Sequence, residues 1–195
     1  MSLEANAADV IKRFEGYSSK TYWDVNAWRL GYGSDTLALP NGTYRTVKQS
    51  DTTTPEMAEK DLERRISREF LPAIRSAVGE PYWSKLPEPA KVALISITYN
   101  YGVGFGKNYP RVTNAARSGD LKALSQEIAA LQGHNSGINA KRRLMEASLV
   151  QSAIGMAKDN PKTTIAIFVI LVLMIVGAVL LLIYRKKVAT VLTKV

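Results

Sequence analysis

The sequence predicts an α+β protein in which a small hairpin lobe precedes a helical lobe, followed by one C-terminal transmembrane helix. Three observations support this fold class. Strand-like segments rich in aromatic residues occur around residues 20–32, apolar residues recur at helical spacing in much of 54–157, and residues 165–183 carry no charge. We therefore expect a globular domain over 1–157, a linker over 158–164, a membrane helix over 165–184 and a short basic tail over 185–195.

The chain begins with a predicted helix and a predicted hairpin. Apolar residues recur at helical spacing at Ala7, Val10, Ile11 and Phe14. Glu15 ends this helix, since Gly16 is typical of a helix stop. Residues 20–23 and 28–32 are typical of two strands around a turn that holds Val25, Asn26 and Ala27. Residues 1–10 lack the basic start and apolar core of a secretory signal peptide, so we expect none.

This arrangement brings two carboxylates, Glu15 and Asp24, to either side of a cleft that could hold a sugar chain. Cleavage of a glycosidic bond needs one protonated carboxyl for the leaving oxygen. It also needs one ionised carboxyl, which steers water or stabilises positive charge on the sugar. The neighbours Phe14 and Tyr17 favour the protonated form of Glu15, and hairpin hydrogen bonds favour the ionised form of Asp24. On spacing alone, solvated surface charges remain the commoner explanation.

The next segment is predicted to be a loop followed by a helix. Residues 37–53 are expected to be loop-like, with a turn at residues 40–42. Thr54 is a predicted N-cap, and Pro55 suits the first helical position. Pro72 is expected to break or kink the helix that follows. One face of that helix is charged and is expected to be solvated: Glu59, Lys60, Glu63, Arg64, Arg65 and Arg68.

The remaining helices form the predicted helical lobe. Residues 90–99 are nearly all apolar, which predicts a buried central helix. Three further helices are expected over 110–117, 121–131 and 141–156, separated by glycines. Tyr99 and Asn100, at the end of the central helix, either face sugar hydroxyls or serve in packing and capping. The sequence leaves both interpretations open.

The composition excludes several kinds of site. The chain has no Cys, which excludes disulfides and thiol nucleophiles. It has one His, His134, which disfavours a His-based triad and a multi-His metal site. We expect His134 to lie exposed in a polar loop. The net charge of +9 suits an anionic cell wall or membrane surface. No nucleic-acid-recognition motif accompanies it, so we expect no nucleic acid partner. We also expect no metal and no organic cofactor.

Residues 165–183 are the strongest physical signal in the chain. At ~1.5 Å per residue, this run nearly spans the ~30 Å hydrocarbon core of a bilayer. Tyr184 and the basic residues 185–187 indicate the far interface. The Lys/Arg bias favours an inside C-terminus, whereas a C-terminal span without a signal peptide usually leaves its domain in the cytoplasm. A virus with a membrane would reconcile these, so we expect a virion membrane or a host inner membrane, with virion proteins as candidate partners.

Four motifs then occur in order. Glu15, eight residues, Asp24 and a Gly-x-Gly turn at 31–33 form the first. Residues 93–104 read ALISITYNYGVG, residues 114–120 read NAARSGD, and residues 137–146 end in RRLME. Together these motifs resemble the phage-type lysozymes, glycoside hydrolase family 24. The resemblance implies a lysozyme-like fold and cleavage of the β-1,4 bond between N-acetylmuramic acid and N-acetylglucosamine in bacterial peptidoglycan.

The resemblance also implies roles for individual residues. Glu15 would be the general acid, and Asp24 would stabilise the oxocarbenium-like transition state or orient water. Arg142 would be the arginine that reaches back to Glu15, unless it is an exposed helical residue paired with Glu146. The candidate catalytic residues are Glu15, Asp24 and Thr36. The candidate substrate-binding residues are Arg29, Tyr32, Asp35, Tyr99, Asn100 and Arg142.

One position departs from the family pattern. Family hydrolases usually carry a Thr two positions before the Gly-x-Gly, where it helps to hold the attacking water, and here that residue is Arg29. A Thr appears only at Thr36. The reaction is therefore hydrolysis or lytic transglycosylation, in which the sugar's own hydroxyl closes a ring. A non-catalytic glycan-binding structural protein of a virion, and a holin-like pore former, remain alternative functions.

Overall fold

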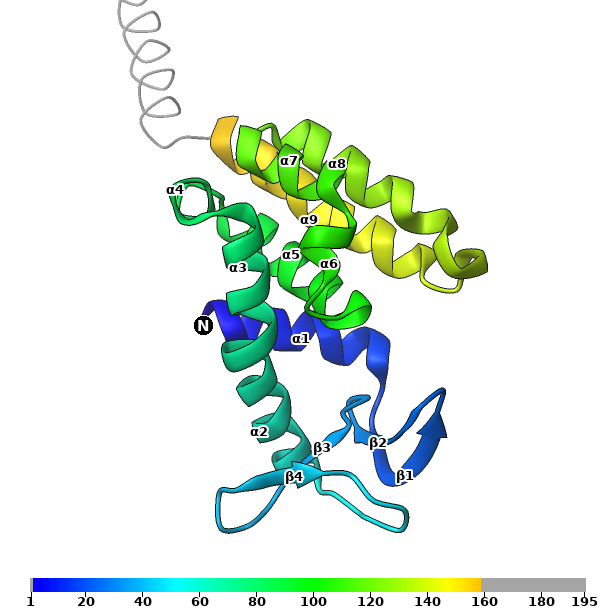
Figure 1. The fold of residues 1–195 in the computed structure, drawn as a ribbon. Coiled ribbons are helices and arrows are strands. Elements are labelled where there is room, and N and C mark those ends of the chain that lie inside the picture. Colours follow the sequence, from blue (N-terminus) through cyan, green and yellow to red (C-terminus); the bar gives the residue numbers. More distant parts are fainter. Residues whose placement is uncertain (1, 159–195) are drawn as a thin grey trace, which may run out of the picture. The chain divides into compact units, whose positions relative to one another are not determined.

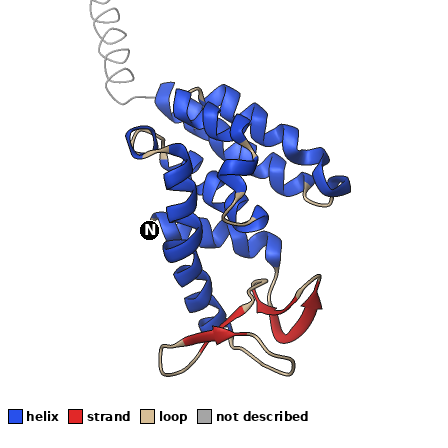
Figure 2. Cartoon of the chain, in the orientation of Figure 1, coloured by secondary structure: helices blue, strands red, loops and turns tan. Residues whose placement is uncertain are grey.

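The computed structural model of the chain describes residues 2–158. Residues up to Ile154 form one compact unit. The strands gather at one end of this unit, and helices make up the rest (Figures 1 and 2). The α+β fold class is therefore confirmed for the described residues, with the hairpins and the helical body in the predicted order.

Helix α1 (Leu3–Glu15) connects the two parts of the unit. The Ser2 side chain caps its first turn by accepting from the Ala5 amide, and Gly16 ends it with a φ of 65°. Its apolar face, centred on Ala7 and Ile11, packs against α5 (Glu88–Tyr101) in the main core. Glu15 therefore stands at the end of a helix anchored in the helical part, as predicted.

The first hairpin pairs β1 (Ser18–Asp24) with β2 (Ala27–Gly31). The turn is shorter than predicted, because Ala27 already pairs with Asp24. A second hairpin joins β3 (Thr36–Ala38) to β4 (Tyr44–Thr46), so the prediction of a loop over 37–53 is wrong there. These strands are too short to show an alternating pattern. A second, small core forms between the two hairpins from Leu30 of β2, Leu37 of β3 and Val47 directly after β4.

A long helical rod follows the hairpins (Figure 1). It consists of α2 (Pro55–Arg65), the π-helical segment η1 (Ile66–Phe70) and α3 (Leu71–Val78). Thr54 caps α2 as predicted. Pro72 does not break the rod, because it lies in the first turn of α3 directly after a wider turn in which the Leu71 amide donates to the Ile66 carbonyl.

The helical part surrounds α5, whose buried residues include Ala93, Leu94 and Ile97. The prediction of a buried central helix is confirmed. The three further predicted helices are present, and His134 is exposed as predicted, in a 3₁₀ segment. The remaining elements are α4 (Glu80–Trp83), α6 (Phe105–Asn108), α7 (Pro110–Ser118), α8 (Leu121–Ala130), η2 (Leu131–Gly137) and α9 (Ala140–Lys158).

The predicted membrane helix over 165–184 and the basic tail over 185–195 lie outside the described residues. Among the helices within residues 2–158, none has the length and apolar character needed to cross a bilayer.

Candidate active site

A cavity of about 390 Å³ lies where the helical part meets the first hairpin. Its walls come from the end of α1, the β1–β2 hairpin with the turn after it, the α2–η1 junction and the end of α5. The residues that line it are Glu15, Tyr22, Asp24, Arg29, Gly33, Asp35, Arg65, Phe70, Tyr99, Asn100, Tyr101 and Gly102. The two predicted catalytic carboxylates therefore share one cavity.

Glu15 forms an ion pair with Arg142, which lies outside the cavity lining. The Arg142 Nη1 donates to Glu15 Oε1 at 2.5 Å, and the Arg142 side chain is only 3% exposed. Arg142 also donates to the Ser96 carbonyl at 2.9 Å. The predicted contact with Glu15 is present, but Arg142 does not line the cavity, so its role is to position Glu15. The apolar surroundings predicted for Glu15 need correction, because a guanidinium is its nearest partner.

A buried charge cluster on α9 supports Arg142. Glu146 accepts from Arg142 Nε at 3.2 Å and from the Ser96 hydroxyl at 2.6 Å, and it lies 3.1 Å from Arg143 Nε. Arg143 Nη2 donates to Asn100 Oδ1 at 3.1 Å, which fixes Asn100 at the cavity wall. Burial raises the pKa of Glu146, although both arginines oppose this effect. Arg142 is thus paired with Glu146 but is not exposed, so that part of the alternative interpretation is wrong.

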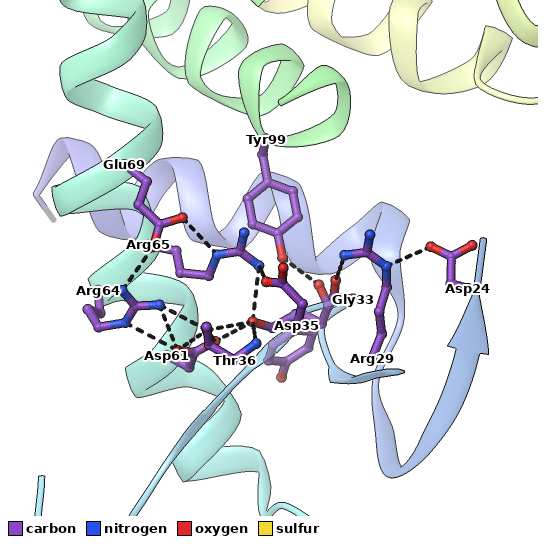
Figure 3. Close-up of polar contacts among 12 residues, drawn as sticks. Asp24, Arg29, Gly33, Asp35, Thr36, Asp61, Arg64, Arg65, Glu69 and Tyr99 are labelled. Atoms are coloured by element: carbon purple, nitrogen blue, oxygen red, sulfur yellow. Dashed lines mark hydrogen bonds and ion pairs between the residues drawn. The ribbon is translucent and has the colours of Figure 1, made fainter. Parts of the chain in front are cut away.

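Asp24 also has an arginine partner, on the hairpin itself (Figure 3). Arg29 lies opposite Tyr22 in the hairpin register, and its Nε approaches Asp24 Oδ2 to 2.7 Å. Its Nη1 donates to the Gly33 carbonyl at 3.2 Å. Arg29, which stands where the lysozymes that this sequence resembles usually carry a Thr, therefore reaches across the hairpin to Asp24. Asp24 remains about half exposed, with 47% of its side chain accessible.

The Gly-x-Gly turn makes room for Glu15. A Cβ at Gly33 would lie 3.2 Å from Glu15 Oε2, and Gly33 has a φ of +78° that L-residues rarely adopt. A Cβ at Gly31 would lie 2.9 Å from the Cβ of Ala58, so this glycine lets the hairpin approach α2. Gly33 is therefore needed for the position of Glu15, and Gly31 is needed for packing against α2.

The segment after this turn alternates between the cavity and the protein interior. Asp35 lines the cavity and pairs with Arg65 at 3.0 Å. Thr36 instead donates to the buried Asp61 at 2.8 Å and accepts from Arg64 Nη2 at 2.9 Å (Figure 3). The structure thus places Thr36 outside the residues that line this cavity, and its catalytic assignment stays a prediction.

Two tyrosines predicted to bind substrate, Tyr32 and Tyr99, differ in whether they line the cavity. The Tyr99 hydroxyl donates to the Tyr32 carbonyl at 2.6 Å, and burial raises the pKa of Tyr99. Tyr99 lines the cavity, whereas Tyr32 does not and its ring faces Tyr17 at 5.7 Å between ring centres. Tyr32 therefore contributes its backbone carbonyl to the contact between the hairpin region and α5. Tyr99 serves both in packing and at the cavity wall.

The sequence interpretation missed Tyr22, Arg65, Phe70 and Tyr101, which also line the cavity. Arg65 was assigned to a solvated face, yet only 13% of its side chain is exposed. The sequence feature that could have indicated a paired Arg65 is Glu69, four positions later, a spacing that favours ion pairs on a helix. Within residues 2–158, no group of three or more acidic, His or Cys side chains is arranged to hold a metal ion.

Comparison with known proteins gives one family and one fold. The family described as "Phage lysozyme" matches residues 12–146. The muramidase domain of SpmX from Asticaccaulis excentricus aligns with a TM-score of 0.59 and 21% identity, over 76% of this chain and 97% of that one. A mutant P22 lysozyme aligns with a TM-score of 0.61 and 24% identity, over 77% and 99%.

The active form of the P1 phage endolysin Lyz has a TM-score of 0.59 and 17% identity, with 76% of this chain and 84% of that one covered. At these identities the structural likenesses establish the fold alone. A comparison with curated protein sequences gives no match.

Proposed function

We infer the function from the family to which this chain belongs, the phage lysozymes. The chain is accordingly an enzyme of the glycosidase class. We propose that its substrate is bacterial peptidoglycan and that it cleaves the β-1,4 bond between N-acetylmuramic acid and N-acetylglucosamine. The observation that carries this proposal is that Glu15 and Asp24 line one cavity from two different elements.

In this proposal Glu15 is the general acid and donates its proton to the leaving glycosidic oxygen. Arg142 fixes the position of one carboxyl oxygen, Oε1, and Gly33 leaves the other oxygen, Oε2, accessible from the turn. Asp24 stabilises the positive charge that develops on the sugar ring in the oxocarbenium-like transition state. Arg29 holds the Asp24 carboxylate in place on the hairpin.

Lytic transglycosylation of the same bond is the second candidate reaction. Arg29 occupies the position from which a Thr usually helps to hold water, and a guanidinium has no acceptor for a water proton. The ion pair with Arg29 also engages Asp24, the other group that could orient water. In transglycosylation the sugar's own hydroxyl attacks the anomeric carbon, and the ring closes without a positioned water.

One product analysis tests both reactions. Incubate the full-length chain in mild detergent with purified peptidoglycan, alongside Glu15→Gln and a control variant, Glu4→Gln, in the same helix but outside the cavity. Mass spectrometry of the fragments distinguishes reducing-end muramic acid, from hydrolysis, from anhydro-muramic acid, from transglycosylation. Either product should be lost in Glu15→Gln and kept in Glu4→Gln. Binding to the wall without any fragment would contradict the enzymatic proposal and favour a glycan-binding structural protein.

We also propose that residues 165–184 anchor the chain in a virion membrane or a host inner membrane, as part of a phage protein that acts on the wall during infection or lysis. The uncharged run at 165–183 supports this. Leu173→Lys would place a charge in its centre at a cost of ~2.5–3.5 kcal/mol on insertion scales. We expect the wild-type chain to float with liposomes and resist carbonate extraction, and the variant to do so less. Equal extraction of both would contradict the anchor, and leakage of a liposome dye would favour the pore former.

A further inference from the structure

We propose that Arg65 is a substrate-binding residue that recognises the N-acetyl group of a sugar in the cavity, and that Glu69 positions it. This inference rests on the proposed function, because it assumes a glycan in the cavity that holds Glu15. It assigns a role to a residue whose charge alone suggests only a solvated helix face.

Arg65 is the last residue of α2 and reaches the cavity wall. Its Nε donates to Glu69 Oε2 at 3.1 Å, and its Nη1 donates to the Ser34 hydroxyl at 3.1 Å and lies 3.0 Å from Asp35 Oδ1 (Figure 3). Among the described residues, Nη2 forms no hydrogen bond. The guanidinium is therefore held rigidly by two of its nitrogens, while the third keeps donors for a ligand.

The π-helical segment η1 explains how Glu69 reaches Arg65. Glu69 binds Arg65 and also accepts from Arg64 Nη1 at 2.9 Å, so one carboxylate bridges two consecutive arginines. In a regular α-helix with ~3.6 residues per turn, a residue five positions on lies well round the helix from its partner. The wider π turn brings Glu69 back over both arginines, and single π turns of this kind occur frequently at functional sites.

The surroundings of Arg65 match an acetamide. Its guanidinium lies 5.1 Å from the centre of the Phe70 ring and 5.9 Å from that of Tyr99, and both rings line the cavity. An N-acetyl group presents a carbonyl oxygen that can accept from Nη2 and a methyl group that can pack on an aromatic ring. An anionic ligand is less suitable, because the carboxylates of Glu15, Asp24 and Asp35 face the same cavity.

Arg64 is a matched control on the same helix. All three of its guanidinium nitrogens donate to protein groups, namely Asp61, Glu69 and Thr36. Its guanidinium stacks on Tyr44 at 4.7 Å, and it does not line the cavity. The two neighbouring arginines thus share Glu69 but differ in whether a donor is left for a ligand.

The test uses two forms of peptidoglycan from one source, one fully N-acetylated and one with free glucosamine amines. We expect the full-length wild-type chain to prefer the acetylated form. Arg65→Lys keeps the charge but has one donor nitrogen in place of three and so lacks Nη2, so KM on the acetylated form should rise about tenfold and the preference should largely disappear. Glu69→Gln should reduce the preference with a smaller change in kcat than in KM, and Arg64→Lys should keep it.

A binding measurement separates this inference from the proposed function. Titrate full-length Glu15→Gln, with and without Arg65→Lys, with a tetramer of N-acetylglucosamine and with the glucosamine tetramer. Binding of the acetylated tetramer that weakens about tenfold in the double variant supports the inference, even if the wild-type chain releases no fragments. Equal binding of both tetramers, absence of binding, or an unchanged preference in Arg65→Lys would overturn it. Loss of cleavage alone would count only against the proposed function.

Discussion

Two arginine–carboxylate pairs stand at the same cavity but belong to different parts of the molecule. Arg142 reaches Glu15 from the helical part and is 3% exposed, with Ser96 and Glu146 around it. Arg29 reaches Asp24 within one hairpin, where the two side chains are 25% and 47% exposed. Both are arginine–carboxylate ion pairs, but the Arg142 side chain is buried, whereas the Arg29–Asp24 pair is partly exposed.

This difference indicates what each pair contributes. Burying Arg142 costs desolvation free energy that only several well-placed partners offset, so removal of one partner leaves uncompensated charge. An exposed pair is screened by water and contributes at most about 1 kcal/mol to stability. The Glu15 pair therefore couples the site to the stability of the helical part. The Asp24 pair can change with little effect on the fold, so we expect a change there to act mainly through the electrostatics of the cavity.

The largest expected effect is the loss of the buried arginine. Arg142→Met leaves Glu146 with one guanidinium fewer, so we expect the free energy of unfolding to fall by about 3–5 kcal/mol. Arg29→Met, the matched change on the hairpin, should cost less than about 1 kcal/mol. Urea denaturation of both variants measures the two losses. Equal losses would show that burial does not distinguish the pairs.

A second expected effect concerns the pH dependence of the buried cluster. Because burial raises the pKa of Glu146 in the folded chain, the folded state holds this proton more tightly than the unfolded state. The contribution of Glu146 to stability is therefore greatest below about pH 4.3, the ordinary pKa of Glu, and falls as the pH rises through the folded-state pKa. Urea denaturation at several pH values should show wild type losing stability relative to Glu146→Gln as the pH rises above about 4.3. A constant difference would contradict this.

The two hairpins allow a further comparison through two glycines with nearly the same backbone. Gly33 and Gly42 have φ values of +78° and +79°, but a Cβ meets Glu15 only at Gly33 and open space at Gly42. Substitution by Ala should cost about 1–2 kcal/mol of stability at each position. Only Gly33→Ala should also displace the Glu15 carboxyl and lower kcat, by about tenfold or more. Thermal melts and initial rates on peptidoglycan measure these effects, and equal activity of both variants would contradict the role of Gly33.

The smallest expected effect belongs to the ion pair beside the second hairpin. Arg45 donates to both oxygens of Asp51 at 2.6 and 2.7 Å, which lowers the pKa of Asp51 to about 2. Its contribution to stability is present above about pH 3.9 and is lost as the pH falls through about 2. Since Arg45 is partly exposed, Asp51→Asn should cost about 1 kcal/mol or less at pH 6. The cost should vanish near pH 2, the reverse of the trend for Glu146, as thermal melts would show.

Elements that depend on local chemistry could be predicted from the sequence. Thr54 with Pro55 begins α2 and Gly16 ends α1, because capping groups and the permissive backbone of glycine act within a few residues. The nearly uniform apolar run of α5 could only be a central helix. The sequence motifs also predicted that Glu15 and Asp24 face one cleft and that Arg142 contacts Glu15.

Which side chains face the cavity could not be predicted from the sequence, because it depends on how the elements pack. In the turn after β2, Asp35 faces the cavity and Thr36 faces Asp61, a difference set by contact with α2 and invisible in the sequence. Arg64 and Arg65 are equivalent as charges on a helix, yet the π turn and Glu69 give them different partners. Caps and periodicity act over a few residues, whereas the direction of a side chain in the site depends on segments far apart in the chain.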